Sequence, residues 1–167
     1  CYYRIICNYV TPYSQQVIGS DLSYGLQSSA ILYDMRTGKT LLSILTAKRL
    51  FNDGLIDYVL IVCPKTIMHS VWEPNLIEQG LPCCVLDQGK LQDEMNLSNA
   101  GLEIGFRVFI ITYESIDTRL QLLTKYLDLS RTYVIGDETT QIKSHTATRT
   151  KAFHALTYLP TYKTILT

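Results

Sequence analysis

Three consecutive residues, Gly38, Lys39 and Thr40, have the chemistry and spacing of a phosphate-binding loop. Phosphoryl oxygens need backbone N–H groups at a helix N-terminus, a lysine charge and a hydroxyl group for magnesium, and these residues supply all three. The tripeptide is short, so an ordinary strand-turn-helix with a solvated lysine is the alternative. Tyr33 also stands where the full motif has a glycine. The loop therefore predicts a nucleotide phosphate site only in combination with its context.

A second chemical group, the adjacent carboxylates of Asp137 and Glu138, follows the apolar residues 133–135 and Gly136. One carboxylate of such a pair can hold magnesium while the other positions or deprotonates an attacking water. The alternative is a solvated acidic turn at the end of a strand. On a parallel sheet, this pair and the phosphate loop would lie at the same edge, outside the carboxyl ends of the strands. We therefore expect the two groups to converge on one ligand.

The elements that must position these groups alternate along the chain. Short apolar runs predict strands, and apolar residues at helical spacing predict helices between them. A capping box at residues 70–73, with Ser70 as the N-cap, predicts a helix start there. We expect strands at residues 30–32, 58–63, 83–86, 107–112, 133–135 and 164–166, helices at 17–26, 41–51 and 120–129, and a polar loop at 88–105. This order predicts an α/β fold with an open, mainly parallel sheet and helices on both faces.

Composition limits the class of protein. The chain has 167 residues and is 47% hydrophobic, which favours a single domain over residues 1–167 and excludes a disordered chain. The formal net charge is +0, so any contact with nucleic acid must come from a local patch. The cysteines lack metal-ligand spacing, and neither a membrane span nor a signal peptide is evident. We expect a cytoplasmic protein with reduced thiols and no membrane contact. Because the chain starts without Met and stops within an apolar run, we also expect it to be a piece of a longer protein.

In order along the chain, these residues resemble the motifs of superfamily-two helicases, and within them the Swi/Snf-type DNA translocases. Residues 32–40 (LYDMRTGKT) resemble motif I, which typically reads LADMGTGKT, and this accounts for Tyr33. Residues 12–16 (PYSQQ) resemble the glutamine motif, and residues 137–143 (DETTQIK) resemble the Asp-Glu box with the Ile-Lys of this branch. The remaining matches are residues 62–65 with Trp72 to motif Ia, 111–115 to motif Ib, 149–152 to the helix after the Asp-Glu box, and 165–167 to the start of motif III.

The resemblance implies a RecA-like P-loop NTPase lobe, the N-terminal one of two, that uses ATP and Mg²⁺ to move along DNA, most simply duplex DNA held by its phosphates. The second lobe, which supplies the arginine fingers, is not encoded here, so this lobe alone should hydrolyse ATP weakly or not at all. The site residues that the resemblance implies are Lys39, Asp137 and Glu138 for catalysis; Gln16, Arg36, Thr37, Gly38, Lys39 and Thr40 for ATP, with Gln16 reading adenine; Thr40 and Asp137 for magnesium; and Lys65, Tyr113, Lys143 and Arg149 for DNA.

One departure from the family pattern is Arg36, which stands where the family usually has glycine and places a cation beside the phosphates. It favours a phage or bacterial member, acting in a bacterial or phage-infected cell. Two other functions stay open: a non-catalytic scaffold or nucleotide-binding lobe, and a P-loop phosphotransferase, although no Arg-rich lid segment is present. For the DNA-side residues, the alternatives are ordinary solvated cations and, for Tyr113, a packed tyrosine.

Overall fold

The structure is a computed structural model that describes residues 12–33, 37–100, 102, 107–139 and 148–167. Its strands form one six-stranded sheet in the order β1-β6-β5-β2-β4-β3, and every pairing is parallel. In chain order, the strands are β1 (Ser28–Ile31), β2 (Tyr58–Cys63), β3 (Cys83–Val85), β4 (Val108–Thr112), β5 (Thr132–Asp137) and β6 (Tyr162–Leu166). The predicted α/β fold with a parallel sheet is confirmed.

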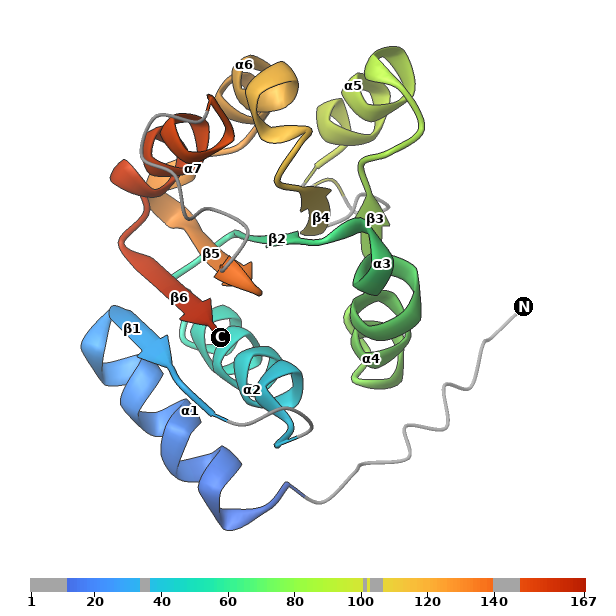
Figure 1. The fold of residues 1–167 in the computed structure, drawn as a ribbon. Coiled ribbons are helices and arrows are strands. Elements are labelled where there is room, and N and C mark those ends of the chain that lie inside the picture. Colours follow the sequence, from blue (N-terminus) through green and yellow to red (C-terminus); the bar gives the residue numbers. More distant parts are fainter. Residues whose placement is uncertain (1–11, 34–36, 101, 103–106, 140–147) are drawn as a thin grey trace.

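Helices cover both faces of the sheet, as predicted. α1 (Ser14–Leu26), α2 (Lys39–Asn52) and the helical segment after β2 lie on one side, and α5 (Lys90–Ser98), α6 (Ile116–Tyr126) and α7 (Thr148–Tyr158) lie on the other (Figure 1). The segment after β2 consists of α3 (Lys65–Ile67), the π-helix η1 (Met68–Trp72) and α4 (Glu73–Glu78); a 3₁₀ turn, η2 (Leu129–Arg131), precedes β5. In the described part of the chain, we find no helix with the length and apolar character needed to cross a membrane.

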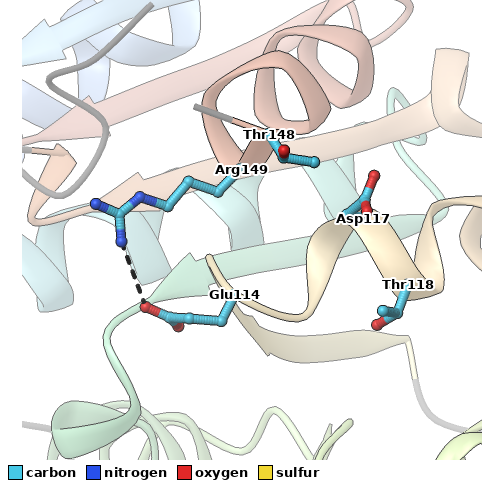
Figure 2. A pocket seen from close by; sticks show the side chains of 5 residues that line it. All are labelled: Glu114, Asp117, Thr118, Thr148 and Arg149. Atoms are coloured by element: carbon cyan, nitrogen blue, oxygen red, sulfur yellow. Dashed lines mark ion pairs between the residues drawn. The ribbon is translucent and has the colours of Figure 1, made fainter. Parts of the chain in front are cut away.

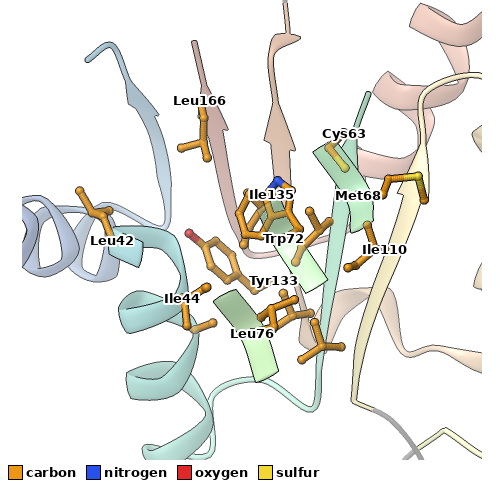
Figure 3. Packing of buried hydrophobic residues seen from close by; sticks show 14 of the residues in the cluster. Leu42, Ile44, Cys63, Met68, Trp72, Leu76, Ile110, Tyr133, Ile135 and Leu166 are labelled. Atoms are coloured by element: carbon orange, nitrogen blue, oxygen red, sulfur yellow. The ribbon is translucent and has the colours of Figure 1, made fainter. Parts of the chain in front are cut away.

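The alternation of side chains along the strands produces two hydrophobic cores. In β2, Val59 and Ile61 belong to the cluster under α2 and α4, whereas Leu60 and Val62 belong to the cluster under α6 and α7. Figure 3 shows part of the first cluster, in which Trp72 of η1 packs among residues such as Ile135 of β5. Because a central parallel strand is buried on both faces, a continuous apolar run such as residues 58–63 is the pattern that predicts it.

The predicted loop at residues 88–105 is wrong over its first half, where α5 occupies Lys90–Ser98. Only Asp93 and Leu97 of this helix are buried, and Leu91 and Met95 are exposed. Because only two residues of α5 are buried, its sequence shows no sustained repeat of apolar residues at helical spacing. The carboxylate of Asp93 accepts a hydrogen bond from Arg119 of α6 at 2.6 Å, so a polar contact anchors the helix.

The predicted capping box at residues 70–73 is also wrong. The helical segment starts directly after Pro64 and runs through η1 into α4. The hydroxyl of Ser70 donates to the carbonyl oxygen of Thr66 at 2.7 Å, so it bonds backwards within the helix and does not cap a helix start. Pro74 has no N–H to donate to the preceding turn, and the irregular π turn lies just before it. The predicted helix at residues 120–129 starts earlier, at Ile116.

Candidate nucleotide and magnesium site

The phosphate loop leads from β1 into α2, and Gly38 lies at the N-cap of that helix with φ 81°. A side chain is disfavoured there for two reasons. The positive φ belongs to the left-handed region, and a Cβ atom would lie 1.9 Å from Nε2 of Gln16. The first turn of α2 therefore starts at a glycine, and the N-terminus of the helix lies at the loop, as phosphate binding requires.

Gln16 of α1 joins this loop through its side-chain amide. Its Oε1 accepts a hydrogen bond from the backbone N–H of Tyr13 at 2.8 Å, and its Nε2 donates to the carbonyl oxygen of Gly38 at 3.3 Å. The side chain is buried. The fold thus brings the predicted glutamine to the phosphate loop, although its role as a reader of adenine stays a prediction.

Lys39 is the first residue of α2, and its ammonium turns back over the loop. Its Nζ donates to the carbonyl oxygen of Tyr33 at 2.5 Å, and Lys39 also lines the cavity described below. The lysine charge is therefore held beside the loop, where a phosphate oxygen would be a stronger acceptor than a carbonyl.

The acidic pair ends β5, and Asp137 is its buried member, with 8% of its surface exposed. Its Oδ2 accepts a hydrogen bond from the indole N–H of Trp72 at 2.9 Å, and its Oδ1 accepts one from the backbone N–H of Glu138 at 2.9 Å. Burial raises the pKa of Asp137 above its usual range, whereas these two hydrogen bonds oppose the rise. Glu138 has φ 50°, an uncommon backbone conformation for a residue with a side chain.

The phosphate loop and the acidic pair face one cavity of about 630 Å³, a size typical of sites for small molecules and cofactors. Ile67, Val71 and Asn75 form its wall on the α3–α4 side. The residues that line it are Thr37, Gly38, Lys39, Thr40, Leu41, Ile67, Val71, Asn75, Asp137, Glu138 and Thr167. The two groups that the sequence predicted to converge therefore do so.

The donors in this cavity fit magnesium. Thr40 contributes a hydroxyl group and Asp137 a carboxylate, and hard cations prefer oxygen ligands. Among the residues that the structure describes, no group of three or more His, Cys, Asp or Glu side chains could hold a metal ion. A site with few protein ligands suits magnesium, which usually keeps several waters and binds the phosphates of its substrate.

The sequence profile of the SNF2-related domain matches residues 20–167, which is most of the chain. The chain belongs to this family. The expected likeness to Swi/Snf-type helicases is therefore confirmed. A search of curated protein sequences finds no match.

Solved structures show that the SNF2-related domain has the RecA-like fold of helicase lobes. The SWI2/SNF2 ATPase core of Sulfolobus solfataricus, solved in complex with double-stranded DNA, matches with a TM-score of 0.74 and 20% identity. The match covers 95% of this chain and 32% of that one. The UvsW helicase of bacteriophage T4 matches with a TM-score of 0.68 and 13% identity, covering 94% of this chain and 52% of that one. The domain thus spans about a third to a half of these proteins.

Tyr113 of the SNF2-related domain was predicted to face DNA, and the structure corrects this. The side chain is fully buried, and its hydroxyl donates to the carbonyl oxygen of Asp137 at 2.8 Å. Its ring packs beside Phe153 of α7, with a centroid distance of 5.6 Å. Tyr113 directly follows Thr112, the polar last residue of β4, so its burial is decided by the packing of the fold. Burial raises the pKa of its hydroxyl, which stays protonated as a donor.

Two of the predicted DNA-side cations, Lys65 and Arg149, lie near the carboxyl edge of the sheet in separate hollows. Lys65 lines a groove of about 540 Å³ together with Thr66, Ser115, Arg119 and Glu138. Arg149 extends from α7 towards Glu114, with 4.0 Å between Nη1 and Oε1, above a smaller hollow of about 380 Å³ (Figure 2). Two further predicted site residues, Arg36 and Lys143, lie outside the described residues.

Arg119 and Trp72 are site residues whose roles the sequence did not predict. Arg119 lines the groove beside Lys65, but it stands just before the helix predicted at residues 120–129, and no motif marked it. Trp72 was recognised as part of motif Ia, without a role. Only the fold places its indole N–H on a carboxylate 65 residues further along the chain.

Proposed function

We propose that this SNF2-related domain is the ATP-binding lobe of a DNA-dependent ATPase that hydrolyses ATP to ADP and phosphate and moves along DNA. One observation carries the proposal: the phosphate loop and the acidic pair line the same cavity. Either motif alone occurs in unrelated proteins. A helix N-terminus, a lysine and two carboxylates around one cavity are the set that hydrolysis of a nucleoside triphosphate needs.

The predicted site residues have separate roles in this proposal. The N–H groups at the start of α2 and the ammonium of Lys39 bind the β- and γ-phosphates. Thr40 and Asp137 hold magnesium, which neutralises charge on the phosphates when it is bound. Glu138 orients the attacking water and accepts its proton. Gln16 reads the adenine base from its position against the loop.

Contacts with DNA are proposed for the carboxyl edge of the sheet. Lys65 is exposed at the groove beside Glu138, and Arg149 is exposed on the neighbouring α7. Such cations bind phosphates, so their contacts are independent of base sequence and weaken with salt. The likeness to a SWI2/SNF2 core solved with double-stranded DNA supports duplex DNA as the partner.

A second RecA-like lobe of the same parent protein completes the proposed machine. The chain covers 32% and 52% of the two helicase structures, so both contain much more than this domain. Arginine fingers from a second element raise phosphoryl transfer by about 10³ to 10⁵-fold. We therefore expect the isolated chain to bind ATP but to hydrolyse it slowly.

The first test is binding of ATP to this chain in the presence of magnesium, measured by calorimetry. Lys39→Ala should weaken binding by about ten- to a hundred-fold, because a hydrogen bond to a charged group contributes roughly 1.5–3 kcal/mol. Lys151→Ala, which removes an exposed lysine of α7, is the matched control and should bind like the parent. Equal binding by the parent and by folded Lys39→Ala would refute the phosphate-loop assignment.

The second test uses the longer protein that contains both lobes. Its ATPase rate should rise on addition of duplex DNA, and Glu138→Gln should abolish that rate while ATP binding persists, because the amide cannot accept a proton. A DNA-independent rate, or release of no phosphate under any DNA condition, would contradict the proposed ATPase.

A further inference from the structure

We propose that Trp72 is a positioning residue for magnesium: its indole N–H fixes the orientation of the Asp137 carboxylate, so that the carboxylate presents a set geometry to the ion. The proposal rests on the proposed function, because it assumes that Asp137 serves magnesium in the nucleotide cavity. It adds a residue that lines neither the cavity nor the groove.

The contact has the features of a positioning bond. Trp72 is fully buried, and its indole nitrogen is a donor only, so it can serve no purpose here except to donate. It donates to Oδ2 of Asp137 at 2.9 Å, while the backbone N–H of Glu138 donates to Oδ1 at 2.9 Å. With one donor on each oxygen, rotation of the carboxylate would break two hydrogen bonds in a buried site. Such supporting bonds orient metal ligands in general.

The helical segment that carries Trp72 also forms a wall of the nucleotide cavity. Two sets of its residues, each spaced four apart, face different surroundings. One set, Ile67, Val71 and Asn75, lines the cavity. The other set, Met68, Trp72 and Leu76, is buried in the core beneath it. The segment thus faces the cavity on one side and, through Trp72 on its buried side, contacts the Asp137 carboxylate.

The π-helix η1 covers Met68–Trp72, and its final residue is the donor. A π turn rotates the residues after it relative to a regular α-helix, and such turns occur frequently at functional sites. The rotation is therefore located where it sets the direction of the Trp72 ring. Lys65 begins the same segment and lies in the neighbouring groove, so a shift of this segment would reach the groove and Asp137 together.

The test is the magnesium dependence of nucleotide binding, measured by anisotropy of a fluorescent ATP analogue on this chain. Trp72→Phe keeps an aromatic ring in the core and removes the N–H. It should raise the half-saturating magnesium concentration about ten-fold, the lower end of the loss typical for groups that support a metal ligand. Binding of the analogue without magnesium should be unchanged.

Two control variants separate the hydrogen bond from packing. Tyr133→Phe removes another buried hydrogen bond of the same core, the one that its hydroxyl donates to Thr164 at 2.8 Å. Leu76→Ala leaves a cavity in the same helical segment. Both should keep the magnesium dependence of the parent. An equal shift in Leu76→Ala, or no shift in folded Trp72→Phe, would overturn the proposal.

A second measurement needs no variant. The chain has a single tryptophan, so a ¹⁵N-labelled sample gives one indole N–H cross-peak, and that peak belongs to Trp72. Addition of magnesium to the nucleotide-loaded chain should move this peak, since its acceptor is the proposed magnesium carboxylate. A peak that stays in place while magnesium strengthens nucleotide binding would overturn the inference alone. A parent chain that binds no nucleotide at any magnesium concentration would overturn the proposed function as well.

Discussion

The side-chain amide of Gln16 donates to the carbonyl oxygen of Gly38 at 3.3 Å and thereby joins α1 to the phosphate loop. The same contact leaves no room for a side chain at Gly38, where a Cβ atom would lie 1.9 Å from the amide nitrogen. The shape of the loop and the position of the predicted adenine-reading residue are therefore set together.

This relationship predicts that Gly38→Ala will impair both stability and nucleotide binding. The positive φ alone costs an L-residue roughly 1–2 kcal/mol, and displacement of Gln16 adds to this cost. Urea unfolding and ATP binding measure the two effects. Gly25→Ala on α1 is the matched control: no heavy atom lies within 4 Å of the added Cβ, and we expect unchanged or slightly higher stability because alanine favours helix. Equal behaviour of the two variants would contradict the prediction.

The buried ion pair between α5 and α6 predicts a large loss of stability for Asp93→Ala. Asp93 is fully buried, and Arg119, which lies 2.6 Å from its Oδ2, is 15% exposed. Removal of one partner of a buried pair typically costs about 3–5 kcal/mol, because the other charge is left uncompensated. Urea unfolding measures the loss.

The neighbouring residue Glu94 is the control for that experiment, because it joins the same two helices through Lys125 at 3.1 Å at an exposed site. Exposed pairs contribute little to stability, so Glu94→Ala should unfold nearly like the parent. A loss in Glu94→Ala as large as that in Asp93→Ala would show that burial of the pair is not what matters.

DNA affinity should depend on Lys65 and be independent of the hydroxyl of Tyr113. Loss of one phosphate contact in Lys65→Ala should weaken duplex binding at every sequence and reduce the slope of log affinity against log salt by about 1. Tyr113→Phe should keep both affinity and slope and lose about 1 kcal/mol of stability with the bond to Asp137. Titrations with duplex DNA at a series of salt concentrations measure both the affinity and the slope. A lower salt slope in Tyr113→Phe would revive the predicted DNA contact.

A pH dependence of stability is expected from His69. Its Nδ1 lies 2.7 Å from Glu73, its Nε2 lies 3.3 Å from Asp87, and these two hydrogen bonds raise the pKa of the imidazole, Glu73 contributing most. A raised folded-state pKa stabilises the protonated form. The contribution is therefore complete below the ordinary pKa of about 6.5 and disappears as the pH rises through the raised value.

Urea unfolding across this pH range tests the prediction. The stability difference between the parent and His69→Gln should shrink as the pH rises, because glutamine does not titrate. A difference that is constant with pH, or that grows, would contradict it. The side chain is about half exposed, so added salt should also reduce the difference.

Several features of this protein could be predicted from the sequence because they depend on local patterns. The continuous apolar runs predicted the positions of strands β2, β4 and β5, since a buried parallel strand is apolar on both faces. The loop through Gly38 was predictable because the residue types required by phosphate are contiguous. The convergence of this loop and Asp137 also followed, because parallel strands bring their carboxyl ends to one edge.

Only the tertiary structure decided which polar and aromatic side chains meet. Tyr113 directly follows β4, and nothing in its local sequence distinguishes a ring that faces DNA from one that packs on Phe153. α5 was missed because its sequence has no sustained apolar repeat. A hydrogen bond from Arg119 of another helix anchors it instead. Trp72 could be recognised as a motif residue, but its bond to Asp137 depends on a π turn and on the distance between two elements. Local patterns encode the elements and the phosphate loop, whereas contacts between distant side chains depend on how those elements pack.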